Sequence, residues 1–294
     1  MTTRESRGDR MFQWGVYIIT ALICIVTLYP LLYAVSASLS SPEHILSGKV
    51  WLWPVDLTFD AYRRVFASND VMIGYRNTIF YALGGTLFNM IMTIMAAYPL
   101  SLPDIKGRNA LTFFITFTMF FSGGMIPLYL TVKQFGMMDT IWALVLPGAI
   151  STYNMIVIRT AFQAIPDSLI ESAQLDGAND LIILWKIVVP LSKATLATML
   201  LFYAVTHWNS YFDAMLYINK KEMYPLQIML RNMLIGGLFN EETAIAGANA
   251  DSFAVTDATL RSAAIIVTTL PILVVYPFVQ RYFVKGVMIG GVKG

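Results

Sequence analysis

Six long apolar runs constrain the fold of this 294-residue chain more than any other feature. They occupy roughly residues 11–38, 76–102, 110–132, 140–161, 194–218 and 262–284. A helix needs about 20 mostly apolar residues to cross a bilayer, and each run provides that length. Charged residues make up only 13% of the chain, whereas soluble domains contain about 25%. The sequence therefore predicts an all-α polytopic membrane protein with six transmembrane helices.

The first run is predicted to be an uncleaved transmembrane helix. Arg4, Arg7 and Arg10 precede it, as in a signal peptide, but it is longer than a signal h-region of about 7–15 residues. An even number of spans places both termini on one side of the membrane. Basic residues at the N-terminus and in the short turn Pro103–Asn109 favour the cytoplasm for both termini and for the loop at 162–193.

Several function classes are excluded by what the sequence lacks. It has no Gly-x-x-x-x-Gly-Lys-Ser/Thr pattern, so it does not bind ATP through a P-loop. Cys24 is the single cysteine, which excludes an internal disulfide and a cysteine-based metal site. His44 and His207 are far apart, so we expect no metal site. No run of Lys or Arg points to nucleic acid.

The loop at 162–193 interrupts the apolar pattern with the charged, glycine-broken segment Glu171-Ser172-Ala173-Gln174-Leu175-Asp176-Gly177-Ala178. Ser168 at the N-cap and Glu171 at N3 would form a capping box at the start of a short helix. Gly177 would supply the left-handed residue that ends this helix. The segment is therefore predicted to begin with a short, sharply terminated helix.

A second short helix is predicted directly after the glycine. Asn179 or Asp180 would cap it, and Pro190 would stop or kink it. The two helices would form a compact knob that presents Leu169, Ala173 and Ala178. By itself this pattern also fits an ordinary helical hairpin in a cytoplasmic loop.

The spacing of this loop resembles the EAA loop of ABC importer permeases, which reads Glu-Ala-Ala, three residues, Gly, nine residues, Ile-x-Leu-Pro. Here Ser172 replaces an Ala and Val189 replaces the Leu. Other segments resemble the maltose-transporter G-type branch of carbohydrate permeases, and the overall pattern is similar to that of alginate importers. These segments are Ala97-Tyr98-Pro99-Leu100, Ile126-Pro127-Leu128-Tyr129, Gly136-Met137-Met138-Asp139-Thr140, Trp208-Asn209, Gln280–Gly286 and Gly290–Gly294.

The resemblance implies a type I ABC importer permease fold in three parts. Residues 1–69 would hold the N-terminal segment, the first span and an outer loop. Residues 70–284 would form the permease core, with the coupling loop 162–193 and an outer loop 219–261. Residues 285–294 would be a cytoplasmic tail. The chain would import an oligo- or polysaccharide, including acidic ones such as alginate, by alternating access across the cytoplasmic membrane.

The resemblance also implies partners and residue roles. The chain would pair with a second related permease, an ATPase dimer that binds ATP and Mg, and an extracytoplasmic solute-binding protein. It would itself be no enzyme and hold no cofactor. The residues that would couple the chain to the ATPase are Ser168, Glu171, Ser172, Ala173, Asp176, Gly177, Ala178 and Pro190.

The fifth apolar run contains an unusually polar turn, Thr206–Asp213. In a continuous helix, His207 and Tyr211 share one face and Asn209 and Asp213 another. A carboxylate at the bilayer centre costs at least about 2.5–3.5 kcal/mol, so this turn should face protein or water. It would either bond neighbouring helices or line a substrate path with His207, Trp208, Asn209, Tyr211 and Asp213.

The third run is interrupted by Gly123, Gly124 and Pro127. Glycine and proline at membrane depth mark a kink or a close approach of helices. These residues could form a gate, but a packing kink is the simpler interpretation.

Alternative functions remain open at this stage. One is an ABC permease for another small solute, and a second is an ion-coupled secondary transporter, which would require inverted repeats that are not visible here. A membrane scaffold without transport activity would not need the polar turn of the fifth run.

Overall fold

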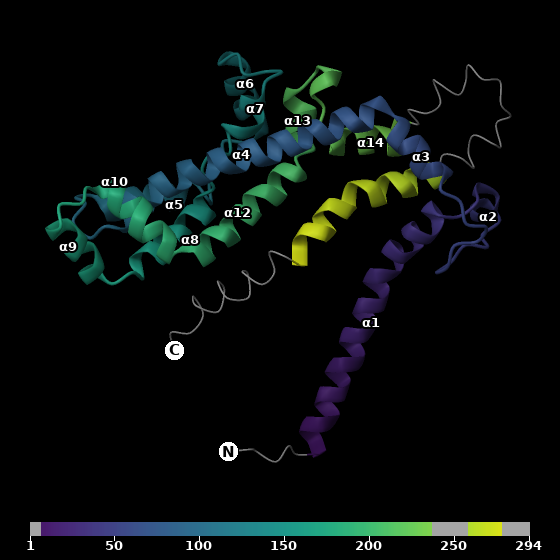
Figure 1. Ribbon diagram of the computed structural model, residues 1–294, viewed down its shortest axis with the longest axis horizontal. Helices are drawn as coiled ribbons and strands as arrows, with labels where there is room; N and C mark the ends of the chain where they lie inside the picture. Colours follow the sequence, from purple (N-terminus) through teal and green to yellow (C-terminus); the bar gives the residue numbers. More distant parts are fainter. Residues whose placement is uncertain (1–6, 237–257, 278–294) are drawn as a thin grey trace. The chain divides into compact units, whose positions relative to one another are not determined.

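The computed structural model of the chain describes residues 7–236 and 258–277. Within these ranges the chain is helical, with no strand beyond an isolated bridge between Ser40 and Leu57, so the prediction of an all-α chain is confirmed (Figure 1). Residues 237–257 of the predicted outer loop 219–261 and the whole predicted tail 285–294 lie outside the described residues. The chain divides into two compact units, Met1–Asn69 with Leu230–Thr269 and Asp70–Met229 with Leu270–Gly294.

Three helices in the described ranges are long and apolar enough to cross a membrane: Gly8–Ser38, Asn69–Ser101 and Ala258–Pro277. A fourth crossing exists if Asp180–Leu191 and Lys193–Trp208, which meet at 87°, act as one span. The predicted apolar runs are therefore helical, but only three of them are single long helices in the part of the chain that the structure describes.

The other runs are broken where glycine, proline or a short polar residue interrupts them. Breaks lie at 118–124 between α5 (Arg108–Phe117) and α6 (Met125–Gln134), at 146–151 between α7 (Ile141–Val145) and α8 (Thr152–Gln163), and at 209–211 between α12 (Lys193–Trp208) and α13 (Phe212–Tyr217). Each break frees backbone groups that must find partners inside the protein or in water.

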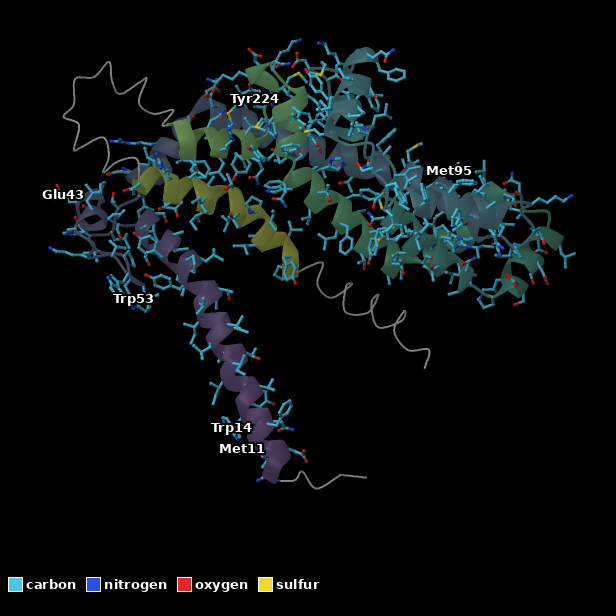
Figure 2. The ribbon with its side chains drawn as sticks, turned by 180° about the vertical axis from the view of Figure 1, so that it is seen from behind. Met11, Trp14, Glu43, Trp53, Met95 and Tyr224 are labelled. Carbon is cyan, nitrogen blue, oxygen red and sulfur yellow. The ribbon has the colours of Figure 1, made fainter. Side chains whose placement is uncertain are left out.

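The first unit is built around α1 (Arg7–Ser38), with α2 (Pro42–Leu46) and α3 (Asp60–Ala67) following. Side chains radiate from all sides of α1, as Met11 and Trp14 do in Figure 2, and its membrane-length segment is 0% buried. The following loop closes on the end of α1, where the Ser40 hydroxyl donates to the Ser36 carbonyl at 2.6 Å. A helix that is apolar all round needs a lipid or protein environment.

The second unit is organised by α4 (Asn69–Ser101), which carries an apolar cluster on each half of its length. One cluster joins the C-terminal half of α4 to α8, to the segment 183–188 and to α12, with Ala97, Ile158 and Ile183 at 0% exposure. The other joins Tyr81 of α4 to α6, α7 and α13. Two separate clusters fix α4 against both ends of the α12–α13 segment.

Hydrogen bonds of Asp139 link its own turn to the segment 217–220 of the second unit. Its backbone has a positive φ of 56°, and its N–H donates to the Tyr217 carbonyl at 3.0 Å. Its carboxylate accepts hydrogen bonds from the backbone N–H groups of Asn219 and Lys220. The Asn219 amide in particular lowers the pKa of Asp139, because hydrogen bonding favours the charged carboxylate.

Because the Asp139 carboxylate accepts these hydrogen bonds in its ionised form, the free energy of unfolding should depend on pH. Because the folded-state pKa is lowered, the contribution is fully present above the ordinary aspartate pKa of about 3.9 and is lost as pH falls through the folded value. Asp139→Asn removes the charge and tolerates the left-handed backbone, so it should lower the midpoint of thermal unfolding at neutral pH but not in strong acid. The exposed Asp104→Asn is the control. An equal loss at both pH values would contradict the role of the ionised carboxylate.

Candidate functional site

The charged loop at 162–193 folds as a series of short helices: α9 (Asp167–Leu175), α10 (Asp180–Ile183), the π-helical turn Leu184–Val188 and α11 (Val189–Leu191). Gly177 follows α9 with a φ of 79°, which confirms the predicted left-handed residue. Ala178 N–H donates to the Ala173 carbonyl at 2.9 Å, and Gly177 N–H to the Gln174 carbonyl at 3.0 Å. This pair of bonds is a Schellman motif, so the backbone bends sharply here.

The predicted capping box is wrong. Helix α9 begins at Asp167, Pro166 takes the N-cap position, and no side chain caps this helix. Ser168 lies inside the first turn, where its carbonyl accepts a hydrogen bond from the Ser172 hydroxyl at 2.8 Å. The helix therefore starts at Asp167, two residues before the first helical position that a Ser168 cap would give, with Pro166 at a φ of −60° in the N-cap position.

The second helix starts as one of the two predicted alternatives. Asn179 is the N-cap, and its Oδ1 accepts from the Ile182 N–H at 2.9 Å. Pro190 lacks an N–H and follows the wide π-helical turn, which accommodates the missing hydrogen bond. The chain then turns by 87° into α12. The loop therefore leads directly into α12.

The surface of this loop carries solvent-exposed apolar side chains that the sequence pattern did not predict. Leu175, at the end of α9, is 89% exposed, and Leu181 is 57% exposed. Ala173 and Ala178 instead pack inward against the apolar cluster of the second unit, whereas Leu169 is 45% exposed. Exposed leucines in a polar loop are typical of a surface that binds another protein.

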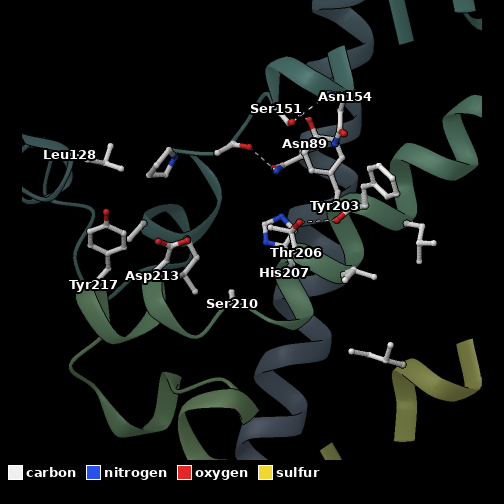
Figure 3. Close-up of a pocket in the computed structure, with 18 of the residues that line it drawn as sticks. Asn89, Leu128, Ser151, Asn154, Tyr203, Thr206, His207, Ser210, Asp213 and Tyr217 are labelled. Atoms are coloured by element: carbon white, nitrogen blue, oxygen red, sulfur yellow. Dashed lines mark hydrogen bonds between the residues drawn. The ribbon is translucent and has the colours of Figure 1, made fainter. Parts of the chain in front are cut away.

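A cavity of about 860 Å³ lies between α4, α7, α12 and α13 of the second unit. Figure 3 shows Tyr203, Thr206 and His207 on one side and Asp213 and Tyr217 on the other. Polar residues that line it are Asn89, Ser151, Asn154, Tyr203, Thr206, His207, Ser210, Asp213, Tyr217 and Tyr276. Apolar side chains such as Leu128 and Leu201 complete the wall. A mostly apolar cavity with a few converging polar groups is typical of a ligand site.

Three polar atoms of this lining have no hydrogen-bond partner among the described residues. They are Asn89 Oδ1, His207 Nε2 and Ser210 Oγ. Asn89 and His207 are only 2% and 4% exposed. The Asn89 amide nitrogen is already used, because it donates to the Gly148 carbonyl at 3.0 Å. An unsatisfied buried polar group costs about 1–3 kcal/mol, so water or a ligand is the natural partner of these atoms.

A tyrosine hydroxyl holds the cavity walls together. Tyr203 O–H donates to Thr93 Oγ1 at 2.6 Å and accepts the Ser151 N–H at 2.9 Å. Thr93 uses its own proton to bond the Asn89 carbonyl. Helices α4 and α12 and the start of α8 therefore meet at one point.

The five predicted path residues do not share one continuous helix. Helix α12 ends at Trp208, so the facial pairing expected from a continuous helix is wrong. His207 and Asp213 line the cavity. Trp208 lines a separate apolar cavity of about 290 Å³ and makes an edge contact with Tyr75. Tyr211 packs against the apolar cluster around Tyr217.

Asn209 explains the break. It sits directly after α12, and its side-chain amide donates back to the Val205 carbonyl at 3.0 Å while its oxygen accepts from Gln227. A short polar side chain that bonds the backbone competes with helix continuation. The polar turn therefore separates two helices rather than extending one.

The predicted gate residues lie at the start of α6. Gly124 has a φ of 88° and occupies the N-cap position, and Pro127 lies in the first turn. None of Gly123, Gly124 and Pro127 lines the large cavity, but the neighbouring Leu128 does.

A close approach of α4 to α12 sets the position of His207. A Cβ atom built on Gly85 would lie 2.7 Å from the imidazole Nε2, whereas on the adjacent Gly84 the nearest atom would be Ile141 Cδ1 at 4.0 Å. Gly85→Ala should therefore displace the ring or separate the helices, at a cost of about 1–3 kcal/mol in stability. Gly84→Ala is the matched control and should be neutral or slightly stabilising. Thermal unfolding of the two purified variants compares them, and equal midpoints would contradict the close approach.

These features define a class of protein. Helices that can cross a bilayer, a polar-lined internal cavity and a loop with bare leucines are typical of a membrane transport subunit with protein partners. The family model described as "Binding-protein-dependent transport system inner membrane component" matches residues 2–289, and the chain belongs to this family.

Similar proteins support this assignment. The chain is 41% identical, over 99% of its length and 100% of the relative, to the polygalacturonan/rhamnogalacturonan transport system permease protein YtcP of Bacillus subtilis (strain 168). It is 38% identical, with a TM-score of 0.90 over 96% of its length and 100% of the other chain, to a chain of a bacterial ABC transporter involved in the import of the acidic polysaccharide alginate. The predicted ABC importer permease fold is confirmed.

A further similar structure is that of a bacterial alginate ABC transporter in complex with an alginate pentasaccharide-bound periplasmic protein. It has a TM-score of 0.63 at 16% identity, over 93% of this chain and 94% of the other. At this identity the likeness shows the common fold alone.

Proposed function

We propose that the chain is the membrane-spanning permease subunit of an ATP-driven importer that carries an oligo- or polysaccharide across the cytoplasmic membrane. The observation that best supports this proposal is that the 162–193 loop is continuous with a helix that lines the large cavity. The loop with the bare Leu175 leads through α11 directly into α12, and α12 supplies Tyr203, Thr206 and His207 to the cavity wall. A partner that moves the loop would therefore move this wall.

The partners follow from the family and from the chain's own chemistry. The family description states dependence on a binding protein, and the sequence lacks a P-loop, so a separate ATPase dimer would hydrolyse ATP with Mg. The coupling residues Ser168, Glu171, Ser172, Ala173, Asp176, Gly177, Ala178 and Pro190 would shape the loop that the ATPase holds. A second related permease would complete the translocation path.

The substrate class rests on the similar proteins and on the cavity. One relative is named for polygalacturonan and rhamnogalacturonan transport, and another chain belongs to an importer of the acidic polysaccharide alginate. In this chain His207 and Asp213, joined by Asn89 and Ser210, would contact the sugar. Trp208, Asn209 and Tyr211 would hold the turn that positions them.

Uptake by the reconstituted complex tests the proposal. The chain is co-expressed with its sister permease, ATPase and binding protein and placed in proteoliposomes, and labelled oligogalacturonate or alginate oligomers are added to the binding-protein side. We expect uptake that requires ATP on the ATPase side. Uptake driven by a proton or sodium gradient without ATP would support the ion-coupled alternative and overturn the proposal.

Orientation follows from the same proposal, with both termini and the 162–193 loop in the cytoplasm. With Cys24→Ala as background, Asp104→Cys should react with a membrane-impermeant thiol reagent only from the cytoplasmic side, and Lys49→Cys only from the outside. Labelling of both positions from one side would show that the number of crossings between them is wrong.

A further inference from the structure

The lining of the large cavity is unusual in its charge. Among the described lining residues, Asp213 is the only acidic one, and none is Lys or Arg. The carboxylate forms no ion pair or hydrogen bond with any described residue. Figure 3 shows it across the cavity from Asn89 and His207. No cation in this lining is available to neutralise it.

The remaining polar groups suit hydroxyls. Asn89 Oδ1 accepts hydrogen bonds, Ser210 Oγ can donate and accept, and a neutral imidazole can do either at His207 Nε2. Imidazole has an ordinary pKa of about 6.5, so none of these groups supplies a full positive charge at pH 8. A sugar carboxylate entering this cavity would meet a negative charge and no counter-ion.

We infer that the cavity receives an uncharged, hydroxyl-bearing part of the saccharide and that Asp213 keeps ionised carboxylates out of it. This inference rests on the proposed function and names the substrate group that this site takes. An acidic saccharide would then pass with its carboxylates turned away from this chain, or with a neutral or esterified sugar residue in this cavity. Asp213 is thus a specificity-determining residue.

Like charges a few ångströms apart, at an effective dielectric of about 20, repel by enough to change a rate or an affinity at least tenfold. Water in the cavity and salt reduce this repulsion. We therefore expect an effect of about tenfold at low ionic strength, and a smaller one at high salt.

A thiol reporter measures the charge selectivity without any substrate. In a Cys24→Ala background, Ser210→Cys is treated at pH 8 with methanethiosulfonate reagents of similar size and opposite charge, trimethylammonioethyl and sulfonatoethyl. The two rates are divided by those of free 2-mercaptoethanol. We expect the normalised cation-to-anion ratio to be about ten, and Asp213→Asn to bring it near one. Asp213→Glu should keep the ratio, as should the control Asp104→Asn, which lies in a turn outside the cavity.

Two results would overturn the inference. One is a normalised cation-to-anion ratio that Asp213→Asn leaves unchanged, and the other is a ratio near one in the Ser210→Cys protein that retains Asp213. Thr206→Cys, across the cavity from Asp213 in Figure 3, is the second reporter if Ser210→Cys does not assemble. Failure of both reporters to react in assembled protein would show that the cavity admits no polar solute and would also overturn it.

Transport then links the charge effect to the substrate. Uptake of an ionised oligogalacturonate is compared with that of its methyl-esterified counterpart of equal length. Asp213→Asn should raise the acid-to-ester ratio about tenfold, and Asp104→Asn should leave it unchanged. An unchanged ratio in Asp213→Asn overturns the inference. Absence of any ATP-dependent sugar uptake in the parent would instead refute the proposed function, while the thiol ratios would still report on Asp213.

Discussion

The Gly177→Val substitution should uncouple the chain from its ATPase while leaving the protein inserted in the membrane. Gly177 has a φ of 79°, and a β-branched residue in this conformation is a strong outlier that costs at least about 1–2 kcal/mol. Relief of the strain would break the two hydrogen bonds of the Schellman motif, to Ala173 and Gln174. We expect ATPase co-purification and substrate-stimulated hydrolysis to fall at least tenfold.

Two controls separate coupling from general strain. Gly177→Asn should be mild, because asparagine tolerates the left-handed conformation. Gly136→Val carries the same type of strain, at a φ of 66°, but lies outside the loop and should retain the ATPase. Wild-type co-purification with Gly177→Val would refute the role of the glycine, and equal losses with Gly136→Val would show that the effect is not specific to the loop.

The Leu175→Ala substitution should strongly lower the affinity of the permease for the ATPase while changing the stability of the subunit very little. The side chain is 89% exposed, so its removal should change subunit stability by no more than about 0.5 kcal/mol. A buried anchor at a protein interface is worth about 2–4 kcal/mol, or roughly 30-fold or more in affinity. The affinity of the purified permease pair for the ATPase measures the effect.

A matched exposed leucine provides the control. Leu46 on α2 is 57% exposed and belongs to the first unit, so Leu46→Ala should leave ATPase affinity unchanged. If Leu175→Ala binds the ATPase as the parent does, Leu175 contacts lipid or solvent in the assembled transporter and the loop must dock through other side chains.

Local chemistry made part of the fold predictable. The apolar runs required helices, because a lipid environment leaves no other way to satisfy this backbone. Gly177 and Asn179 were predictable because each acts on its nearest neighbours in sequence. The prediction of a capping box was wrong for a local reason as well. Ser168 matched the sequence pattern, but Pro166 occupies the N-cap position and Ser168 lies inside the helix.

The cavity could not be predicted in this way. Asn89 lies in α4, Ser151 directly before α8 and Tyr203 in α12, and in sequence they look like ordinary polar residues of apolar runs. The hydroxyl that joins Thr93 to Tyr203 connects residues 110 positions apart, and no periodicity encodes such a pair. Likewise, the break at Asn209 depends on Gln227 in a later segment as well as on Val205 nearby.

The sequence by itself determined the class of fold, the position of the charged loop and the backbone turn within it, because hydropathy, proline, glycine and caps act over a few residues. Only the tertiary structure decided that His207 and Asp213 line the large cavity while Trp208 and Tyr211 do not. The tertiary structure also decided that the Leu175 side chain is exposed to solvent. The physical reason is that burial, cavities and unpaired polar atoms arise from contacts between helices, whose closest approaches, such as that of Gly85 to His207, depend on the packing of the whole unit.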